Sequence, residues 1–400
     1  MISTFFHDWK DSSQFRLIIC LSACILIIKL ILLFGIPINP HAIEDWYIAQ
    51  HIADGNGYSL SHGPTALKTP VYPLFLTPWA ILGNDGKLIA SALQHILWFC
   101  AIVLFYKAVT IRFGTTFAFP ATVLFTLHPA YLYYPFVLES TSITIPLFIC
   151  FWYFSEMSRV GRIHMLIPMF IGWLTALSQP ILIPGIIALQ FFYVGRGKII
   201  SLLLTAIVIF APWTIRNAMT FESFIPSKSP MWMNLYEGMQ NDVHAQEKAR
   251  IESARSIMND VQMEKLYKPI VIRQLREHFS LYIERSLHRC TEFWMIPDRY
   301  RSEMWSPALI LARILPQVIL GIGLLFSFVL VFSKDSTIST ENQQFLRLLM
   351  WTILYVSCVY TLTQASNIRF KLDVEWLQIL LLFPIFQAFP RLQRYMGTMV

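Results

Sequence analysis

Residues 16–36 read RLIICLSACILIIKLILLFGI, an apolar run in which Lys29 is the only charge after the leading Arg16. About 20 apolar residues are enough to cross a hydrocarbon core of about 30 Å as a helix. In lipid such a segment must be helical, because its backbone groups find no other hydrogen-bonding partner there. The run is long and lacks a small-residue cleavage site, so it indicates a retained transmembrane helix rather than a signal peptide. We expect Lys29 to extend toward the membrane interface.

Apolar runs of this kind recur along the whole chain of 400 residues. Hydrophobic residues make up 56% and charged residues 14%, with a mean hydropathy of +0.53, whereas about 25% charged is usual in soluble domains. The composition therefore predicts an all-α polytopic membrane protein, in which residues 1–400 form one transmembrane domain. A single kinked helix through Ser178, Gln179 and Pro180 would give nine membrane-spanning helices. Otherwise about ten are predicted, near 16–36, 88–108, 116–135, 138–156, 164–178, 181–194, 198–213, 306–332, 346–363 and 375–389.

The distribution of Lys and Arg favours ten helices over nine. Cytoplasmic segments of membrane proteins carry an excess of these residues near the helix ends. With a cytoplasmic N-terminus, ten helices give every inside segment a pair, whereas nine would place Arg391 and Arg394 outside. The net charge of +7 is therefore assigned to membrane topology and not to nucleic-acid binding. The inside pairs are Lys10 and Arg16, Lys107 and Arg112, Arg159 and Arg162, Arg196 and Lys198, Lys334 and Arg347, and Arg391 and Arg394.

Two segments between the predicted helices are long enough to carry a site. Residues 37–87 form a first outer loop that is rich in Pro, Gly, His and Tyr, and residues 214–305 form a second. Apolar residues recur near helical spacing from about 243 to 294, which predicts an amphipathic helical cap on the membrane surface. The six cysteines have neither a disulfide nor a metal-site spacing, and His62 and His128 have no partners at metal-ligand spacing.

Ionisable residues from five separate places in the sequence gather on the predicted outer side. A charge at membrane depth costs roughly 2.5–3.5 kcal/mol on insertion scales, so each is a candidate functional residue. Taken singly, the acids could be solvated loop residues and the bases could contact lipid headgroups. Their joint placement favours a common site. The acids are Glu44, Asp45 and Glu139, and the bases are Lys68, Arg216, Arg369 and Lys371.

Acids and bases at a membrane interface suit the transfer of a sugar from an isoprenoid phosphate. Such a donor places its tail in the lipid and its phosphate and sugar at the interface. The leaving phosphate needs electrostatic stabilisation, which Arg and Lys supply, with Arg offering a two-pronged contact. The incoming acceptor hydroxyl is a poor nucleophile and needs a carboxylate to take its proton. The predicted outer face can supply one base and a cationic phosphate clamp.

At these residues the sequence resembles the GT-C superfamily of membrane glycosyltransferases, in particular the branch similar to protein O-mannosyltransferases and the aminoarabinose transferase of lipid A. The chain departs from the family pattern at Gln179, where a basic residue often precedes the proline, and at Asp373, where proline is usual. The Pro-Trp-x-x-Arg-Asn core is the most specific likeness. The stretches that carry the resemblance, in matching order, are EDWYIA (44–49) with GNGYS (55–59), PTA (64–66) with PVYP (70–73), PWTIRN (212–217) and RFKLDVE (369–375).

The resemblance implies a GT-C fold, an outward-facing active site and an inverting transfer from a polyprenyl-phosphate sugar. It implies that a carboxylate of the first loop is the base, and the choice between Asp45 and Glu44 stays open. It leaves open a divalent metal ion as cofactor, because two acids could bind one although cationic phosphate ligands could suffice. The further roles it implies are Glu139 as a second acid near the acceptor or a metal, Lys68, Arg216 and Arg369 as donor-phosphate ligands, and Tyr72, Trp213 and Asn217 as residues that shape the site.

Two other function classes stay open. One is a ligase that takes a diphosphate-linked glycan, and the other is a transporter or flippase of lipid-linked sugars. Transporters usually carry charges near the bilayer midplane and show internal repeats, neither of which the sequence predicts. The expected partners are a polyprenyl-phosphate sugar, membrane lipids and a glycan, lipid or protein acceptor, with no nucleic acid. We expect the protein to span a bacterial inner or plasma membrane with both termini cytoplasmic and the active site on the outer face.

Overall fold

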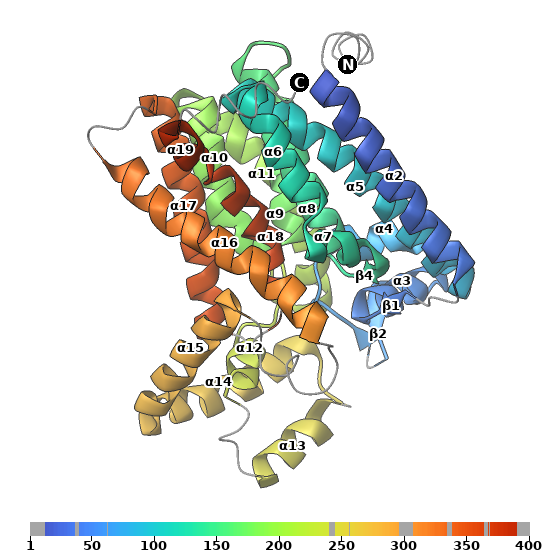
Figure 1. Ribbon diagram of the computed structural model, residues 1–400. Coiled ribbons are helices and arrows are strands. Elements are labelled where there is room, and N and C mark those ends of the chain that lie inside the picture. Colours follow the sequence, from blue (N-terminus) through green and yellow to red (C-terminus); the bar gives the residue numbers. More distant parts are fainter. Residues whose placement is uncertain are drawn as a thin grey trace.

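The computed structural model describes residues 13–36, 40–61, 63–239, 245–255, 257–295, 307–333, 338–363, 367 and 369–389. These residues are mostly helical, and the longer helices form a bundle with a smaller helical group at one end (Figure 1). Among the described residues, five helices of the bundle are long and apolar enough to cross a membrane. They are α2 (Ser13–Gly35), α5 (Gly83–Phe113), α11 (Ile199–Phe221), α16 (Pro307–Phe332) and α17 (Thr340–Thr363). The predicted class, a mostly helical chain with helices long and apolar enough to cross a membrane, is confirmed.

The remaining predicted apolar segments are also helical, but in shorter pieces that prolines delimit. The segment 116–135, predicted as one helix, is divided because Pro129 and Pro135 have no backbone N–H to continue it. Gln179 is extended, with φ −139°, so the segments on its two sides are separate helices. The pieces are α6 (Thr115–Thr126), α7 (Pro129–Tyr133), η1 (Tyr134–Phe136), α8 (Thr141–Arg159), α9 (Leu166–Ser178), η2 (Pro180–Leu182), α10 (Ile183–Val194), α18 (Arg369–Leu380) and α19 (Phe383–Ala388).

One predicted helix end was wrong in a way that matters for the site. The helix predicted to end at 213 continues as α11 to Phe221, and Glu222 then adopts a left-handed conformation with φ 50°. Arg216 and Asn217 therefore lie within the helix and not in the loop after it. The second loop accordingly begins at Glu222. The predicted inside residues Lys10, Lys334, Arg391 and Arg394 lie outside the described residues.

Long apolar faces remain uncovered on the outside of the bundle. A soluble protein seldom leaves contiguous apolar surface of this kind exposed, whereas lipid-facing helices do so along their whole length. Residues more than half exposed include Ile200, Leu203, Leu204, Ile207 and Val208 on α11 and Leu311, Leu315, Leu325, Phe326 and Val329 on α16.

Helix α18 lies inside the bundle, and residues 371–380 are all buried. The rings of Phe105, Trp152 and Trp376 meet with centroids 5.9–6.1 Å apart, which joins α5, α8 and α18. Glu375, a fully buried acid of α18, is held by Arg313 of α16 at 2.9 Å. This packing fixes the position of the N-terminal turn of α18, which carries Arg369.

The smaller helical group consists of α12 (Trp232–Glu237), α13 (Ala245–Arg255), α14 (Asp260–Glu277) and α15 (Phe279–Trp294), and we call it the cap. Within the segment 243–294, predicted to be helical, the described residues form α13, α14 and α15. In α14 the Asn259 side chain accepts from the Gln262 N–H at 3.0 Å and the Gln262 side chain accepts from the Asn259 N–H, so the first turn is closed.

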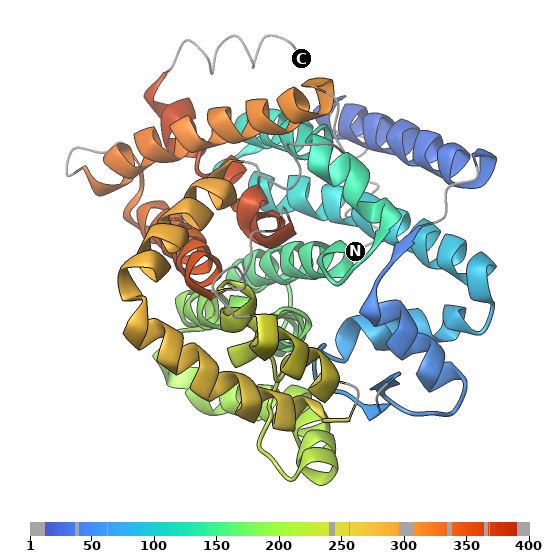
Figure 2. The same ribbon diagram turned by 90° about the horizontal axis from the view of Figure 1, so that it is seen from below.

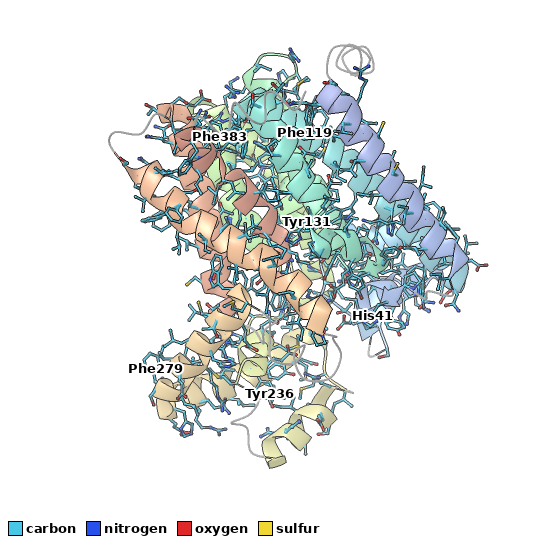
Figure 3. The ribbon with its side chains drawn as sticks, viewed as in Figure 1. His41, Phe119, Tyr131, Tyr236, Phe279 and Phe383 are labelled. Atoms are coloured by element: carbon cyan, nitrogen blue, oxygen red, sulfur yellow. The ribbon has the colours of Figure 1, made fainter. Side chains whose placement is uncertain are left out.

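The first loop folds beside the cap. It contains α3 (Glu44–Ala53), α4 (Val71–Ala80) and the strands β1 (His41–Ala42), β2 (Ser59–Leu60) and β3 (Gly63–Pro64). Seen from below, this loop and the cap occupy the same end of the bundle, which we call the loop end (Figure 2). The start of α2 and helix α19 lie at the opposite end (Figure 1). Of the side chains labelled in Figure 3, His41 lies toward the loop end and Phe383 toward the other.

Candidate functional site

A short parallel strand pair brings the three predicted acids together. The strand β1 pairs with β4 (Val137–Leu138), so that His41 lies opposite Val137 and Ala42 opposite Leu138. Glu139 follows β4 directly, and Glu44 and Asp45 begin α3 just after β1. Because the strands run in the same direction, both chains leave the pair on the same side. Two segments almost a hundred residues apart thus deliver their carboxylates to one place.

Asp45 lies beside a small cavity at the loop end. Its side chain is nearly inaccessible, and the residue is 2% exposed. The cavity has a volume of about 50 Å³. Among the described residues, Asp45 is the only carboxylate in its lining, whereas three cations, Lys68, Lys228 and Arg369, also line it. The other lining residues are Thr69, Ser140, Thr141, Ser178, Gln179, Tyr360 and Phe370.

Ion pairs hold two of the three cations of the cavity, Lys68 and Arg369, in place. Lys68 Nζ lies 3.3 Å from Glu44 Oε2 and 3.8 Å from Asp45 Oδ2. Arg369 donates to Glu139 Oε1 at 2.5 Å, and the Tyr134 hydroxyl donates to the other Glu139 oxygen. Both oxygens of Glu139 thus accept a hydrogen bond. These contacts orient Arg369, and the Glu139 carboxylate lies behind the guanidinium.

The two neighbouring acids of α3 have different electrostatic environments. Burial raises the pKa of Asp45 above its ordinary value, the nearby Lys68 opposes this, and the Glu139 carboxylate adds to it. For Glu44, burial acts to raise the pKa, but Lys68 and hydrogen bonds to the carboxylate outweigh it and lower the pKa overall. The Glu44 side chain is 55% exposed. A proton acceptor that works near neutral pH is better matched by a raised carboxyl pKa, which favours Asp45.

Lys228 is a site residue that the sequence analysis missed. It stands between Pro226 and Pro230 in the loop after α11, and nothing in that pattern marks it except its closeness to the PWTIRN stretch. Burial, together with the Lys68 and Arg369 cations, lowers its pKa to about 8. Lys228 makes no ion pair with any residue in the part of the chain that the structure describes. It is thus a cation beside the cavity that an anionic ligand could pair.

Arg216, predicted to hold the donor phosphate, does not line this cavity. Its guanidinium donates to Thr65 O at 2.8 Å and to Tyr58 O at 2.7 Å, and it lies 5.1 Å from the centre of the Trp213 ring. Asn217 Nδ2 donates to Ile225 O at 2.9 Å. These contacts join the end of α11 to the first loop and to the segment that carries Lys228.

Tyr72 and Trp213 also lie behind the cavity and not in its wall. Tyr72 is fully buried, and its hydroxyl donates to Gln94 Oε1, which fixes α4 against α5. Trp213 Nε1 donates to Ser227 O, the residue before Lys228. The two residues expected to shape the site thus contact α5 and the segment that carries Lys228, and neither lines the cavity.

The polar break between α9 and α10 forms the inner wall of the cavity. Thr69 Oγ1 donates to Ser178 O at 3.0 Å, and Gln179 Nε2 donates to Asp373 Oδ2 at 2.7 Å. Both departures from the family pattern, Gln179 and Asp373, thus contact each other. The sequence signal for this polar wall was the interruption of an apolar run at 178–180.

The site offers a poor fit for a metal ion. Among the described residues, no group of three or more His, Cys, Asp or Glu side chains is placed to hold one. Glu44 and Asp45 share Lys68, and Glu139 is bound to Arg369 and Tyr134. A divalent cation would have to displace these cations before reaching a carboxylate.

No protein-family model, curated protein or solved structure matches the chain. The chemistry of the site is therefore argued from its residues alone. A buried carboxylate beside three cations can accept a proton on one side of a ligand and stabilise a negative charge on the other.

Proposed function

We propose that the chain is a membrane glycosyltransferase that moves a sugar from a polyprenyl-phosphate donor to an acceptor hydroxyl, with inversion at the anomeric carbon. The observation that carries the proposal is the cavity at the loop end, where the buried Asp45 faces Lys68, Lys228 and Arg369. Its lining has an excess of positive charge, as an anionic ligand requires. It also holds one carboxylate, as activation of a hydroxyl requires.

In this reaction Asp45 accepts the proton of the acceptor hydroxyl as its oxygen attacks the anomeric carbon. The bond between that carbon and the phosphate oxygen breaks, and polyprenyl phosphate leaves with the electron pair. Lys68, Lys228 and Arg369 stabilise the charge that develops on the phosphate, so no acid is needed to protonate it. Attack from the face opposite the phosphate inverts the configuration, and no covalent enzyme intermediate forms.

The proposed setting follows from the form of the donor. Its prenyl tail lies in lipid against the apolar bundle, and its phosphate and sugar lie at the loop end. We infer that α2, α5, α6 with α7, α8, α9, α10, α11, α16, α17 and α18 with α19 make ten crossings. The shorter helices cross beside longer ones that shield them from lipid. The loop end then faces the outside of a bacterial inner or plasma membrane, and both termini face the cytoplasm.

The proposal is tested with the full chain purified into lipid nanodiscs. A panel of polyprenyl-phosphate sugars is added with a mixed set of hydroxyl acceptors, and the release of polyprenyl phosphate is followed by mass spectrometry. We expect one donor to be consumed, with its sugar recovered on an acceptor in inverted configuration. Consumption of no donor would contradict the proposal. Movement of a chemically unchanged donor across the bilayer of reconstituted liposomes would also contradict the proposal, because that result identifies a flippase.

The low pKa of Lys228 predicts a pH dependence of donor binding. A lysine with a pKa of about 8 is charged below pH 8 and loses its proton as the pH rises through that value. Loss of one charged contact to the phosphate should raise the donor KM about tenfold between pH 7 and 9. In Lys228→Arg, whose guanidinium stays protonated, the donor KM should be flat over this range. Equal pH profiles for the wild type and this variant would show that Lys228 does not contact the donor.

A further inference from the structure

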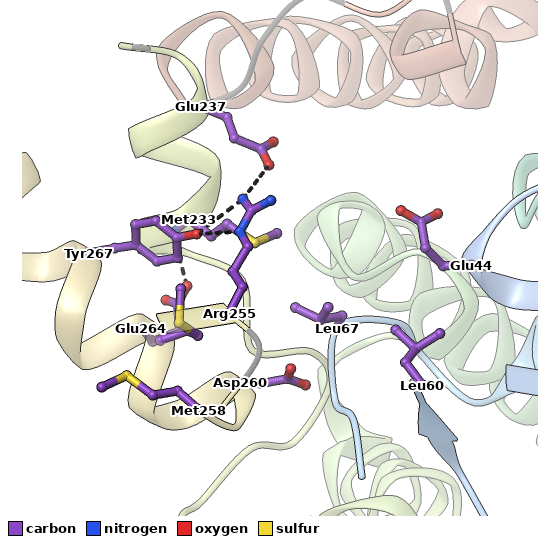
Figure 4. Close-up of a pocket in the computed structure, with 11 residues that line it drawn as sticks. Glu44, Leu60, Leu67, Met233, Glu237, Arg255, Met258, Asp260, Glu264 and Tyr267 are labelled. Atoms are coloured by element: carbon purple, nitrogen blue, oxygen red, sulfur yellow. Dashed lines mark hydrogen bonds and ion pairs between the residues drawn. The ribbon is translucent and has the colours of Figure 1, made fainter. Parts of the chain in front are cut away.

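A second and larger cavity lies between the first loop and the cap, with a volume of about 280 Å³ (Figure 4). Glu44, Leu60 and Leu67 of the first loop face Glu237 and Arg255 of the cap across it (Figure 4). This cavity adjoins the candidate site, because Glu44 lines it and also pairs with Lys68, which lines the site cavity. The two neighbouring acids of α3 thus line one cavity each.

We propose that this cavity binds the acceptor, and that the group it binds is a sugar carrying no phosphate or carboxylate. The inference rests on the proposed function and adds to it the chemical class of the acceptor. In this proposal the acceptor hydroxyl approaches Asp45 by way of Glu44, which lines this cavity and precedes Asp45 on α3.

The charge of the lining argues against an anionic acceptor. Four acids line the cavity and one base, Arg255, opposes them. Arg255 NH2 lies 4.0 Å from Glu237 Oε1 and also donates to the Tyr267 hydroxyl, so it is already shared between an acid and a phenol. An incoming phosphate would meet more carboxylates than cations in this lining, and repulsion between like charges is strong in a partly buried pocket. The four acids are Glu44, Glu237, Asp260 and Glu264.

Two of these acids have structural roles, which leaves the other two for a ligand. Glu264 accepts hydrogen bonds from the backbone N–H groups of Met231, Trp232 and Met233 and so anchors the start of α12. Asp260 accepts from Thr65 Oγ1 at 2.8 Å and from the Ala66 N–H, which ties the cap to the first loop. Glu44 and Glu237 each have one cation nearby, Lys68 and Arg255, and their carboxylates can also accept hydroxyl hydrogens.

The rest of the lining suits a sugar ring. Met233, Met258 and Met263 join Leu60 and Leu67 to make an apolar wall for the C–H face of the ring. A hydroxyl both donates and accepts hydrogen bonds. The Glu237 carboxylate can accept from it, and the Arg255 guanidinium can donate to it. The volume is just below the usual range for small-molecule pockets, roughly 300–1,000 Å³, so it fits one or two sugar residues and not a long chain.

The test uses the reconstituted full chain with the donor that it consumes and three acceptors. These are a neutral oligosaccharide, the same oligosaccharide with one phosphate, and a hydroxyl-rich peptide. We expect transfer to the neutral glycan, with kcat/KM at least about tenfold lower for the phosphorylated one because of charge repulsion. Equal use of the two glycans, or preference for the peptide, would overturn the inference while leaving the proposed function intact. Failure to consume any donor would instead remove the proposed function, and the inference with it.

Variants of the lining test whether the acceptor preference arises in this cavity. Glu237→Lys should shift the ratio of kcat/KM values toward the phosphorylated glycan by about tenfold or more, since it reverses one charge of the lining. Met258→Trp should fill the apolar wall and raise the acceptor KM with the donor KM unchanged. The matched control is Met219→Trp, because Met219 is 81% exposed on α11 and outside both cavities. An unchanged acceptor ratio in Glu237→Lys, or an unchanged acceptor KM in Met258→Trp, would place the acceptor elsewhere.

Discussion

Asp45→Asn is expected to reduce sugar transfer by about 10²–10⁴-fold, the usual contribution of a general base. The amide has almost the same shape as the carboxylate but cannot take the proton of the acceptor hydroxyl. Folding should survive, because Lys68 keeps Glu44 as its partner at 3.3 Å when the charge of Asp45 is removed. The measurement is kcat for polyprenyl-phosphate release in nanodiscs, together with the thermal unfolding midpoint of each variant.

Glu44→Gln is the matched control, because it removes the neighbouring carboxylate from the same turn of α3. Glu44 is half-exposed and does not line the cavity that holds the three cations. Loss of its charge should therefore leave kcat within about tenfold of the wild-type value, as for a charge that only assists binding. A large loss of kcat in Glu44→Gln with normal turnover in Asp45→Asn would assign the base to Glu44. Normal turnover in both variants would contradict the mechanism.

The helical architecture could be predicted because it depends on local sequence. The longest apolar runs identify helices able to cross a membrane without knowledge of their neighbours, as residues 16–36 show. The predicted helix ends were wrong where an apolar run ends gradually. The α11 helix continues through Arg216 because the guanidinium binds carbonyls of the first loop, a tertiary contact that a sequence window does not contain.

The candidate site was only partly predictable for the same reason. Glu44, Asp45, Glu139, Lys68 and Arg369 could be selected from their joint placement on the predicted outer side, and the structure brings all five together. Their pairing depends on the β1–β4 contact, whose strands have two residues each and no detectable sequence pattern. Lys228 could not be selected, because a single Lys in a polar loop resembles any solvated charge. Its importance comes from neighbours more than a hundred residues away in sequence.

The buried pair of Arg369 and Glu139 leads to the second large expected effect. Arg369→Gln should lower transfer by about 10²–10³-fold, as the loss of one donor to a developing charge does in other enzymes. Arg369→Lys keeps the charge but loses the two-pronged geometry, and should recover only part of the activity. The effect should appear in kcat more than in the donor KM, because the phosphate gains charge as the bond breaks.

Glu139 is expected to act through Arg369, as a positioning residue. Glu139→Gln leaves the Arg369 charge in place but removes the carboxylate that orients it at 2.5 Å, so the loss in kcat should be smaller than for Arg369→Gln. If Glu139 works only through this contact, the double variant should be no worse than Arg369→Gln alone, because the two effects are not additive. Rescue of kcat by Glu139→Asp, with unchanged unfolding midpoints, would separate positioning from a general loss of structure. Additive losses in the double variant would instead mean that Glu139 contacts the substrate directly, as the second acid near the acceptor that the sequence resemblance implies.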